Sequence, residues 1–285
     1  MDRPSFKTLR MAVERGIAKI VFDNPPMNLL DEAMFDDLDR LGCWLEQQET
    51  IGVAVFESAD PDFFIAHADL SMLADMTLPH PDEIVGPSPH QQIVERFRTL
   101  PQLTIGKLRG VARGGGSEFL LALDLRYGAT ELAILGQPEI ALGFPPGCGA
   151  TQRLPRLIGR SAAIEVIVGG LDHSAEEAAR IGWLTRAVPD AELDAFVERL
   201  AVTVASRSPY AIAQAKRAIN AATGALDDGL GIELAAFLNA FGTQQARSRV
   251  RRAMASGFQT RSLEKGSLDE WGLGLGDISS KETNP

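Results

Sequence analysis

The chain has 285 residues, 45% of them hydrophobic and 23% charged, a composition typical of a soluble globular protein with one large domain and room for a small appendage. Its formal net charge of −10 argues against nucleic acid and anionic membranes as main partners, because both require a basic surface. A phosphate-bearing small molecule remains compatible, since it needs only a local basic group or a helix N-terminus.

The sequence has no pattern that indicates a metal site, a disulfide framework or a membrane segment. Two cysteines, Cys43 and Cys148, lack Cys-x-x-Cys spacing, and four histidines are scattered without a zinc motif. The first residues contain no apolar signal core, and no apolar run approaches the ~20 residues that span a bilayer. We therefore expect a cytoplasmic protein that holds no metal ion.

The N-terminal part of the chain predicts the order β-β-α-β. Residues 11–22 form two β-prone runs around a Glu-Arg-Gly turn, which indicates a hairpin, and the Asn-Pro-Pro sequence at 24–26 ends it. Apolar residues then recur at helical spacing after Asp31, which is placed as an N-cap. Residues 51–56 predict a short buried strand.

The middle of the chain alternates strands and helices. Residues 58–69 and 75–90 predict loops, and the four prolines of the second loop favour a functional lid. A helix over 91–100 and a strand over 103–108 follow, and Gly114 opens another helix. Short elements come next, with strands near 125–127 and 133–135, helices near 150–158, 161–168 and 175–181, and a strand near 184–188.

Beyond Asp190 the pattern is almost entirely helical. The predicted helices cover residues 190–206, 208–222, 230–240 and 243–256. A glycine-bearing polar tail follows, which we expect to be mobile. The chain as a whole is therefore predicted to be an α/β protein with a helical C-terminal region.

Three successive glycines at 114–116 stand between a strand and an apolar helix. Bare backbone lets a ligand approach closely, and a helix N-terminus offers free N–H groups and a positive dipole end to an anion. A tight turn that binds nothing is the alternative, but three glycines exceed what a turn requires. Glu118, in the first turn, either complements the helix dipole or points into a cleft.

Other polar residues have plain structural explanations when each is taken alone. Glu139 follows a proline, and Pro-Glu is an ordinary helix start. His67 lies between two alanines and is more often a packed, hydrogen-bonded residue than a base. Cys148 has no histidine nearby in the sequence to activate it, so we expect an inert thiol. A catalytic role for Glu118 and Glu139 is favoured only when the two are considered as a pair beside oxyanion donors.

The sequence resembles the enoyl-CoA hydratase/isomerase family, also called the crotonase superfamily, from about residue 11 to about residue 255. Residues 113–124, 135–154 and 66–70 carry the resemblance, in the order of the family motifs and close to their spacing. It implies the crotonase (ClpP-like) fold, an α/β spiral of β-β-α units. It also implies a C-terminal helical region that forms a homotrimer or a dimer of trimers.

By resemblance, the N–H groups of Ala68 and Gly115 form an oxyanion hole for the thioester oxygen of an acyl-CoA. Glu118 would orient and deprotonate the water that adds at C3, and Glu139 would deliver a proton to C2. The N–H of Gly147 would help to position that water. The residues implied along the coenzyme A part of the substrate are Ala66, His67, Ala68, Asp69, Leu70 and Gly115. No separate cofactor is implied, because coenzyme A arrives on the substrate.

The resemblance also suggests a division of the chain. Residues 1–205 would form the core with the active site, residues 206–265 a helical region for oligomerisation and an active-site lid, and residues 266–285 a mobile tail. The tail after about residue 257 matches the family little, and two places within the matched region depart from the family pattern. His67 stands where a glycine is usual, and acidic residues at 60 and 62 stand where a lysine is often found.

Several functions remain open at this point. The fold also serves isomerases, dehalogenases and acyl-CoA hydrolases, although these usually change one of the two glutamates, which favours hydration here. A non-catalytic CoA-binding scaffold is a second class, but it has no need of the glutamate pair. RNA binding is a third, and the acidic charge argues against it despite a cluster of arginines at 247, 249, 251 and 252.

Overall fold

The computed structural model describes residues 3–74, 80, 85–221, 234–235, 237–238 and 241–266. The lid predicted over 75–90 and the helix predicted over 230–240 lie largely outside these residues. The predicted tail at 266–285 lies outside them except for its first residue.

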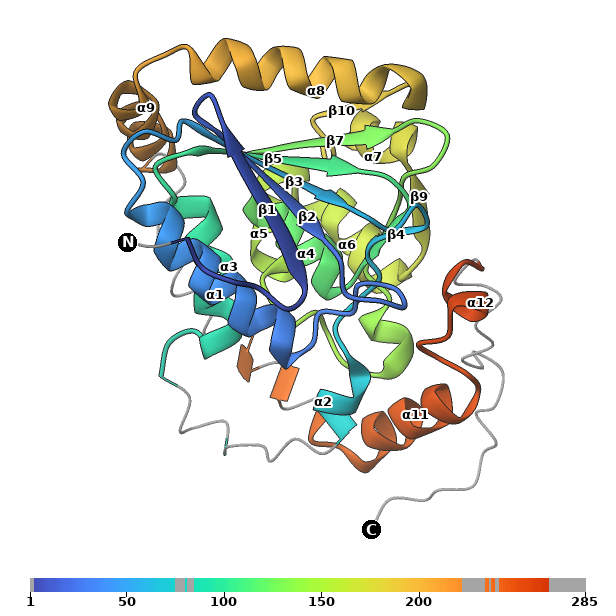
Figure 1. The fold of residues 1–285 in the computed structure, drawn as a ribbon. Helices are drawn as coiled ribbons and strands as arrows, with labels where there is room; N and C mark the ends of the chain where they lie inside the picture. The colour runs from blue at the N-terminus through green and yellow to red at the C-terminus, as the bar shows by residue number, and fades with distance from the viewer. Residues whose placement is uncertain are drawn as a thin grey trace.

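A six-stranded sheet forms the centre of the molecule (Figure 1). Its order is β1 (Leu9–Glu14), β2 (Ile17–Phe22), β3 (Val53–Ser58), β5 (Leu103–Leu108), β7 (Leu125–Ala129) and β10 (Arg186–Val188). Within it, β1 and β2 pair antiparallel and the other neighbours pair parallel. The predicted hairpin is confirmed, and its turn has positive φ at Arg15 (50°) and Gly16 (75°), as a two-residue hairpin turn requires.

A second sheet has four strands of three residues each, in the order β4 (Phe63–Ile65), β6 (Val111–Arg113), β8 (Ile134–Gly136) and β9 (Asp172–Ser174). The loop prediction was wrong over β4, and the sequence did not predict β6 or β9. Three residues are too few to show an alternating pattern, so these strands are defined by their partners rather than by local sequence.

Helices cover both faces of the large sheet (Figure 1). On one face α1 (Glu32–Glu46), α3 (Pro89–Thr99) and α4 (Gly115–Ala122) pack against residues such as Phe56. On the other face α8 (Asp190–Ala205) packs against Val53 and Val55. Strand β3 is thus buried on both sides, which explains its uninterrupted apolar run.

The remaining helices are α2 (Leu70–Ala74), α5 (Ala150–Ile158), α6 (Arg160–Gly169), α7 (Ala175–Ile181), α9 (Pro209–Ala221), α11 (Gln244–Ala255) and α12 (Arg261–Glu264). The predicted cap is confirmed at Asp31, whose side chain accepts from Met34 N at 2.8 Å. The Pro-Glu start opens only a 3-10 turn, η2 (Glu139–Leu142), with Pro138 as its N-cap. Short α2 was not predicted. The α/β fold class is confirmed.

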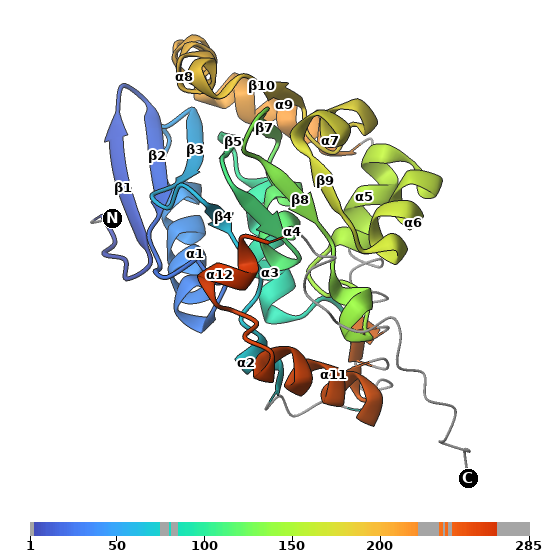
Figure 2. The same cartoon turned by 90° about the vertical axis from the view of Figure 1, so that its right-hand side faces the viewer.

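The end of the described chain returns to the small sheet. Figure 2 shows α12 lying beside β4, far from it in sequence. Within the described part of the chain, no helix combines the length and the apolar character needed to cross a bilayer.

Candidate active site

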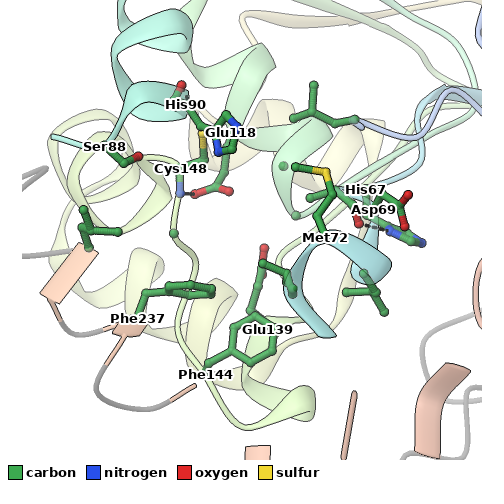
Figure 3. A pocket seen from close by; sticks show the side chains of 18 of the residues that line it. His67, Asp69, Met72, Ser88, His90, Glu118, Glu139, Phe144, Cys148 and Phe237 are labelled. Carbon is green, nitrogen blue, oxygen red and sulfur yellow. Dashed lines mark hydrogen bonds between the residues drawn. The ribbon is translucent and has the colours of Figure 1, made fainter. Parts of the chain in front are cut away.

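A cavity of about 480 Å³ opens between the N-terminus of α4, the loop before α2 and the turn η2 (Figure 3). Every expected site residue except Ala66 lines it. These residues are His67, Ala68, Asp69, Leu70, Gly115, Glu118, Glu139 and Gly147. The described part of the proline-rich loop, residues 85–90, also contributes to the wall. The structure thus brings together the three motifs that the sequence analysis singled out.

Ala66 lies behind the wall of the cavity. It is fully buried in an apolar cluster with Met27, Phe63 and Val111. Its N–H donates to Met27 O at 3.3 Å and its carbonyl accepts from Arg113 N at 3.0 Å. Ala66 therefore supports the loop from within the core and does not contact a molecule in the cavity.

The backbone of Ala68 is oriented by its neighbours. His67 O accepts from Leu30 N at 2.9 Å, and Asp69 N donates to Leu30 O at 3.1 Å, so residues 30 and 68 form a parallel bridge. In such a bridge the N–H of the central residue points to the opposite side. Ala68 N–H is thereby directed away from Leu30.

Gly115 comes close to this amide. A Cβ built on Gly115 would lie 3.3 Å from Ala68 N and 3.2 Å from Ala68 Cβ, so any larger residue would crowd the gap. Gly115 is the first residue of α4, whose first-turn N–H groups have no acceptor within the helix. The two candidate oxyanion donors are therefore neighbours, although they lie far apart in the sequence.

Gly114 is required at its position for two reasons. Its φ is +45°, a conformation that other residues rarely adopt. A Cβ there would also lie 2.7 Å from Glu139 Oε1. Glycine is thus needed at 114 because the 114–116 segment and the segment with Glu139 approach each other closely, and not only because of the turn.

Glu118 is held by the N-terminus of α5. Its Oε1 accepts hydrogen bonds from Cys148 N at 2.8 Å and Ala150 N at 2.9 Å, and the residue is 2% exposed. The left-handed conformation of Gly149 (φ +119°), between the two donors, turns both amides toward one oxygen. The carboxylate is fixed in orientation and faces the cavity (Figure 3).

Glu139 is also buried, with 8% exposure, and lines the same cavity. With the Gln137 amide oriented to satisfy both of its neighbours, its nitrogen donates to the Glu139 carboxylate at 3.2 and 3.3 Å. The Gln137 oxygen then accepts from Ser117 Oγ at 3.1 Å. Ser117 is adjacent to Glu118 in the chain, so one short network connects the surroundings of the two glutamates.

An aromatic cluster forms the apolar end of the cavity. Phe144 and Phe237 pack edge to face with ring centroids 5.2 Å apart, and both line the wall. Gly147 faces this cluster, since a Cβ there would lie 3.1 Å from the Phe237 ring. Its carbonyl accepts from Gln91 Nε2 at 3.1 Å. This end suits an apolar chain.

His67 is a packed, hydrogen-bonded residue, as expected. Its Nδ1 lies 2.8 Å from Ala68 O and its Nε2 lies 2.8 Å from Glu264 Oε1. The Cys148 thiol is also buried, 4.0 Å from the backbone oxygen of His90. Neither residue is arranged as a nucleophile with its base.

Sequence reasoning missed the cavity residues that come from distant segments, including Phe35, His90, Phe237 and Phe258. Local patterns assigned Phe35, His90 and Phe237 to a helix or a loop and assigned Phe258 to neither, and only the tertiary fold brings them to one wall. The acidic pair at 60 and 62 was noted as a departure, and the structure shows its partners, Arg261 and Lys265.

Comparison with known proteins places these features in one family. A model of the family described as enoyl-CoA hydratase/isomerase matches residues 12–259. YngF of Bacillus subtilis, named as a candidate enoyl-CoA hydratase/isomerase, is 35% identical over 249 residues, covering 85% of this chain and 95% of YngF. The short-chain-enoyl-CoA hydratase of Clostridium acetobutylicum is 29% identical over 255 residues, 88% and 94% of the two chains.

A solved structure extends the comparison to the fold. A Streptomyces avermitilis protein named as a candidate enoyl-CoA hydratase superposes with a TM-score of 0.86 and is 36% identical. The match covers 94% of this chain and 97% of that one. The crotonase fold implied by the sequence is confirmed.

Proposed function

Because the chain belongs to the enoyl-CoA hydratase/isomerase family of the crotonase superfamily, we propose that it is a 2-enoyl-CoA hydratase. Such an enzyme adds water across the C2–C3 double bond of an acyl-CoA thioester. One observation carries the proposal. Two neighbouring backbone amides and two buried glutamates face a single cavity with an apolar end.

The amides of Ala68 and Gly115 supply the electrostatic part of the reaction. Water adds at C3 only if the thioester oxygen takes up negative charge, and that oxygen would lie between the two N–H groups. Donors that are fixed before the reaction need no reorganisation, and loss of one such donor typically raises a barrier by about 2.7–4 kcal/mol. The bridge between Leu30 and Ala68 supports this role, because it fixes one of the donors.

The two glutamates supply the proton transfers. Glu118 takes a proton from water as the water oxygen bonds to C3, and the double-bond electrons move to the thioester as an enolate. Glu139 then gives a proton to C2 as the enolate collapses, so one water is added in total. The N–H of Gly147 would help to hold the water. A proton must pass back to Glu139 before the next turnover.

In this proposal coenzyme A enters as part of the substrate and no separate cofactor takes part. Its pantetheine chain would pass along the loop at 68–70, whose residues line the cavity. The aromatic end formed by Phe144 and Phe237 would receive the acyl chain. The proposal includes assembly of the protein as a homotrimer or a dimer of trimers, as the family resemblance implies.

The test is to supply the purified protein with 2-enoyl-CoAs of increasing chain length and to follow loss of the conjugated absorbance and product mass. A product heavier by one water identifies a hydratase, whereas an unchanged mass with a moved double bond identifies an isomerase. Glu118→Gln and Glu139→Gln should each lower kcat by about 10²- to 10⁴-fold. The exposed Glu165→Gln serves as the matched control. Unchanged turnover in both site variants would refute the mechanism.

A further inference from the structure

The last described residues, 258–266, form a C-terminal segment that packs beside the small sheet (Figure 2). Phe258 lines the cavity, with its ring centroid 5.4 Å from that of His67. Gln259 Nε2 donates to Asp69 Oδ1 at 2.6 Å, and Asp69 lines the cavity as well. The segment therefore contacts the loop that contains Ala68.

The central contact of this segment joins Glu264 and His67. Glu264 is fully buried, and its Oε1 lies 2.8 Å from His67 Nε2 and accepts from Gln259 N at 2.8 Å. The other ring nitrogen of His67 faces Ala68 O at 2.8 Å. Both ring nitrogens of His67 thus face oxygen atoms, so both edges of the ring are held. In Figure 3 the ring lies beside Asp69, across the cavity from Glu118.

The charge state of Glu264 agrees with this arrangement. Burial by itself raises the pKa of the carboxyl, but the charge and hydrogen bond of His67, the amide of Gln259 and the charge of Arg113 lower the pKa below its ordinary value. Glu264 is therefore a buried anion that faces His67 and the Arg113 guanidinium.

The same segment also contacts Arg113, which lies close in sequence to the second oxyanion donor, Gly115. Arg113 is fully buried, and its guanidinium donates to Glu264 O at 2.9 Å and to Gly266 O at 3.0 Å. Two further bonds, at 2.8 and 2.6 Å, go to the Asp172 carboxylate of β9. Arg113 stands two residues before Gly115, as His67 stands directly before Ala68.

We propose that Glu264 is a positioning residue for the oxyanion hole, which through His67 and beside Arg113 sets the separation of the Ala68 and Gly115 amides. The inference rests on the proposed function, because it assigns these two amides to the thioester oxygen. Leu30 holds the backbone of the Ala68 loop, and Glu264 holds the side chain of His67 in the same loop. Donors held by two independent contacts keep the geometry that a developing anion needs.

A purely structural role of Glu264 makes a different prediction. If the segment only stabilises the fold, its loss lowers the unfolding temperature but leaves kcat unchanged below that temperature. If Glu264 positions the donors, its loss lowers kcat more than it raises KM, because the donors act mainly in the transition state.

The experiment compares Glu264→Gln, Glu264→Ala, His67→Ala and the double variant His67→Ala/Glu264→Ala. Glu264→Ala should lower kcat by about 10- to 100-fold, less than the 10²–10³ for outright loss of a donor. Glu264→Gln keeps an acceptor for His67 and should recover most of the activity. The double variant should be no worse than the poorer single variant, since both changes break one contact. Lys265→Ala, at the exposed neighbouring residue, is the control.

Backbone amide exchange gives a readout that does not depend on turnover. In Glu264→Ala, exchange should become faster in peptides covering 66–70 and 113–116, and Lys265→Ala should leave both peptides unchanged. Wild-type protein that hydrates no enoyl-CoA overturns the proposed function, while the exchange data still test the positioning. Active wild type with full kcat in Glu264→Ala, or unchanged exchange at 66–70, overturns the inference. If Glu264→Ala fails to fold, His67→Ala supplies the same comparison.

Discussion

Glu118 and Ala150 are joined across the cavity wall by a hydrogen bond of 2.9 Å from the Ala150 amide to Glu118 Oε1. Cys148 N donates to the same oxygen at 2.8 Å. A candidate proton carrier is therefore also the acceptor that satisfies the start of helix α5. Its removal should affect stability and chemistry by separate routes, and suitable substitutions can separate the two.

The first prediction concerns stability at this position. Glu118→Ala leaves two buried amides without their acceptor, whereas Glu118→Gln keeps a side-chain oxygen in place. We expect Glu118→Ala to lower the free energy of unfolding by about 1–3 kcal/mol more than Glu118→Gln does. Urea denaturation of both variants measures the difference, with Glu165→Ala as an exposed control. Equal stability of the two site variants would show that the amides find other acceptors.

The second prediction concerns the glycine beside Glu139. Gly114→Ala places a methyl group in a backbone with φ of +45° and 2.7 Å from Glu139 Oε1. We expect a stability loss of about 1–3 kcal/mol from the backbone strain. We also expect activity to fall by about 10²-fold, the effect of a 1 Å displacement of a reacting group.

Gly169→Ala is the matched control for this change. Gly169 lies at the end of α6, has no positive φ, and has no atom within 4 Å of an added Cβ. It should keep wild-type activity and stability. Full activity in Gly114→Ala would mean that Glu139 moves aside without loss and does not need its observed position.

The sequence predicted those elements whose structure depends on residues close together in the chain. The helix from Gly114 and the hairpin at the N-terminus follow from glycine placement and apolar spacing within a few residues. The pairing of His67 with Glu264 spans 197 residues and lies on no periodic pattern. The sequence therefore predicted a packed, hydrogen-bonded His67 but could not identify its partner. Its partner is set by how the C-terminal segment packs, which a single sequence does not encode locally.

The acidic departure at 60 and 62 has the same explanation. Arg261 pairs with Asp60 and with Asp62, at 2.7 Å for the latter, and Lys265 lies 3.0 Å from Asp62. Both departures from the family pattern are thus contacts of one segment, residues 258–266. His67 and the acidic residues at 60 and 62 therefore contact the same segment in the folded protein, a relationship that the sequence alone did not indicate.

The third prediction concerns the ion pair of Arg113. Asp172→Ala removes one of the two carboxylates that face a fully buried guanidinium, and breaking a buried pair typically costs about 3–5 kcal/mol. We expect a loss of this size in denaturant unfolding. The exposed pair of Arg10 and Asp23 is the control, and Asp23→Ala should cost less than about 1 kcal/mol. Similar losses in both variants would contradict the assignment of Arg113 as a buried anchor.

The fourth prediction is a pH dependence that comes from Glu264. Its pKa in the folded protein lies below the ordinary value of 4.5, because His67, Gln259 and Arg113 outweigh the effect of burial. A carboxyl with a lowered folded pKa stabilises the protein fully above its unfolded pKa. That contribution is lost as the pH falls through the folded pKa. The unfolding free energy of wild type should therefore exceed that of Glu264→Gln near neutral pH, and the difference should shrink below about pH 4.5.

Other charged groups near Glu264 could also contribute to the pH dependence of the unfolding free energy. His67 and Arg113 face the Glu264 carboxylate, Asp172 is paired with Arg113, and Asp69 contacts Gln259 of the same segment. Asp69 also has a pKa below its ordinary value, because the hydrogen bonds of Gln259 and Ser71 outweigh burial, so it too loses its contribution in acid. Asp69 is present in both proteins, and its effect therefore cancels in the difference between wild type and Glu264→Gln. Urea unfolding at intervals from pH 7 to pH 3 measures that difference, and a value that stays constant into acid would show that Glu264 carries no charge in the folded protein.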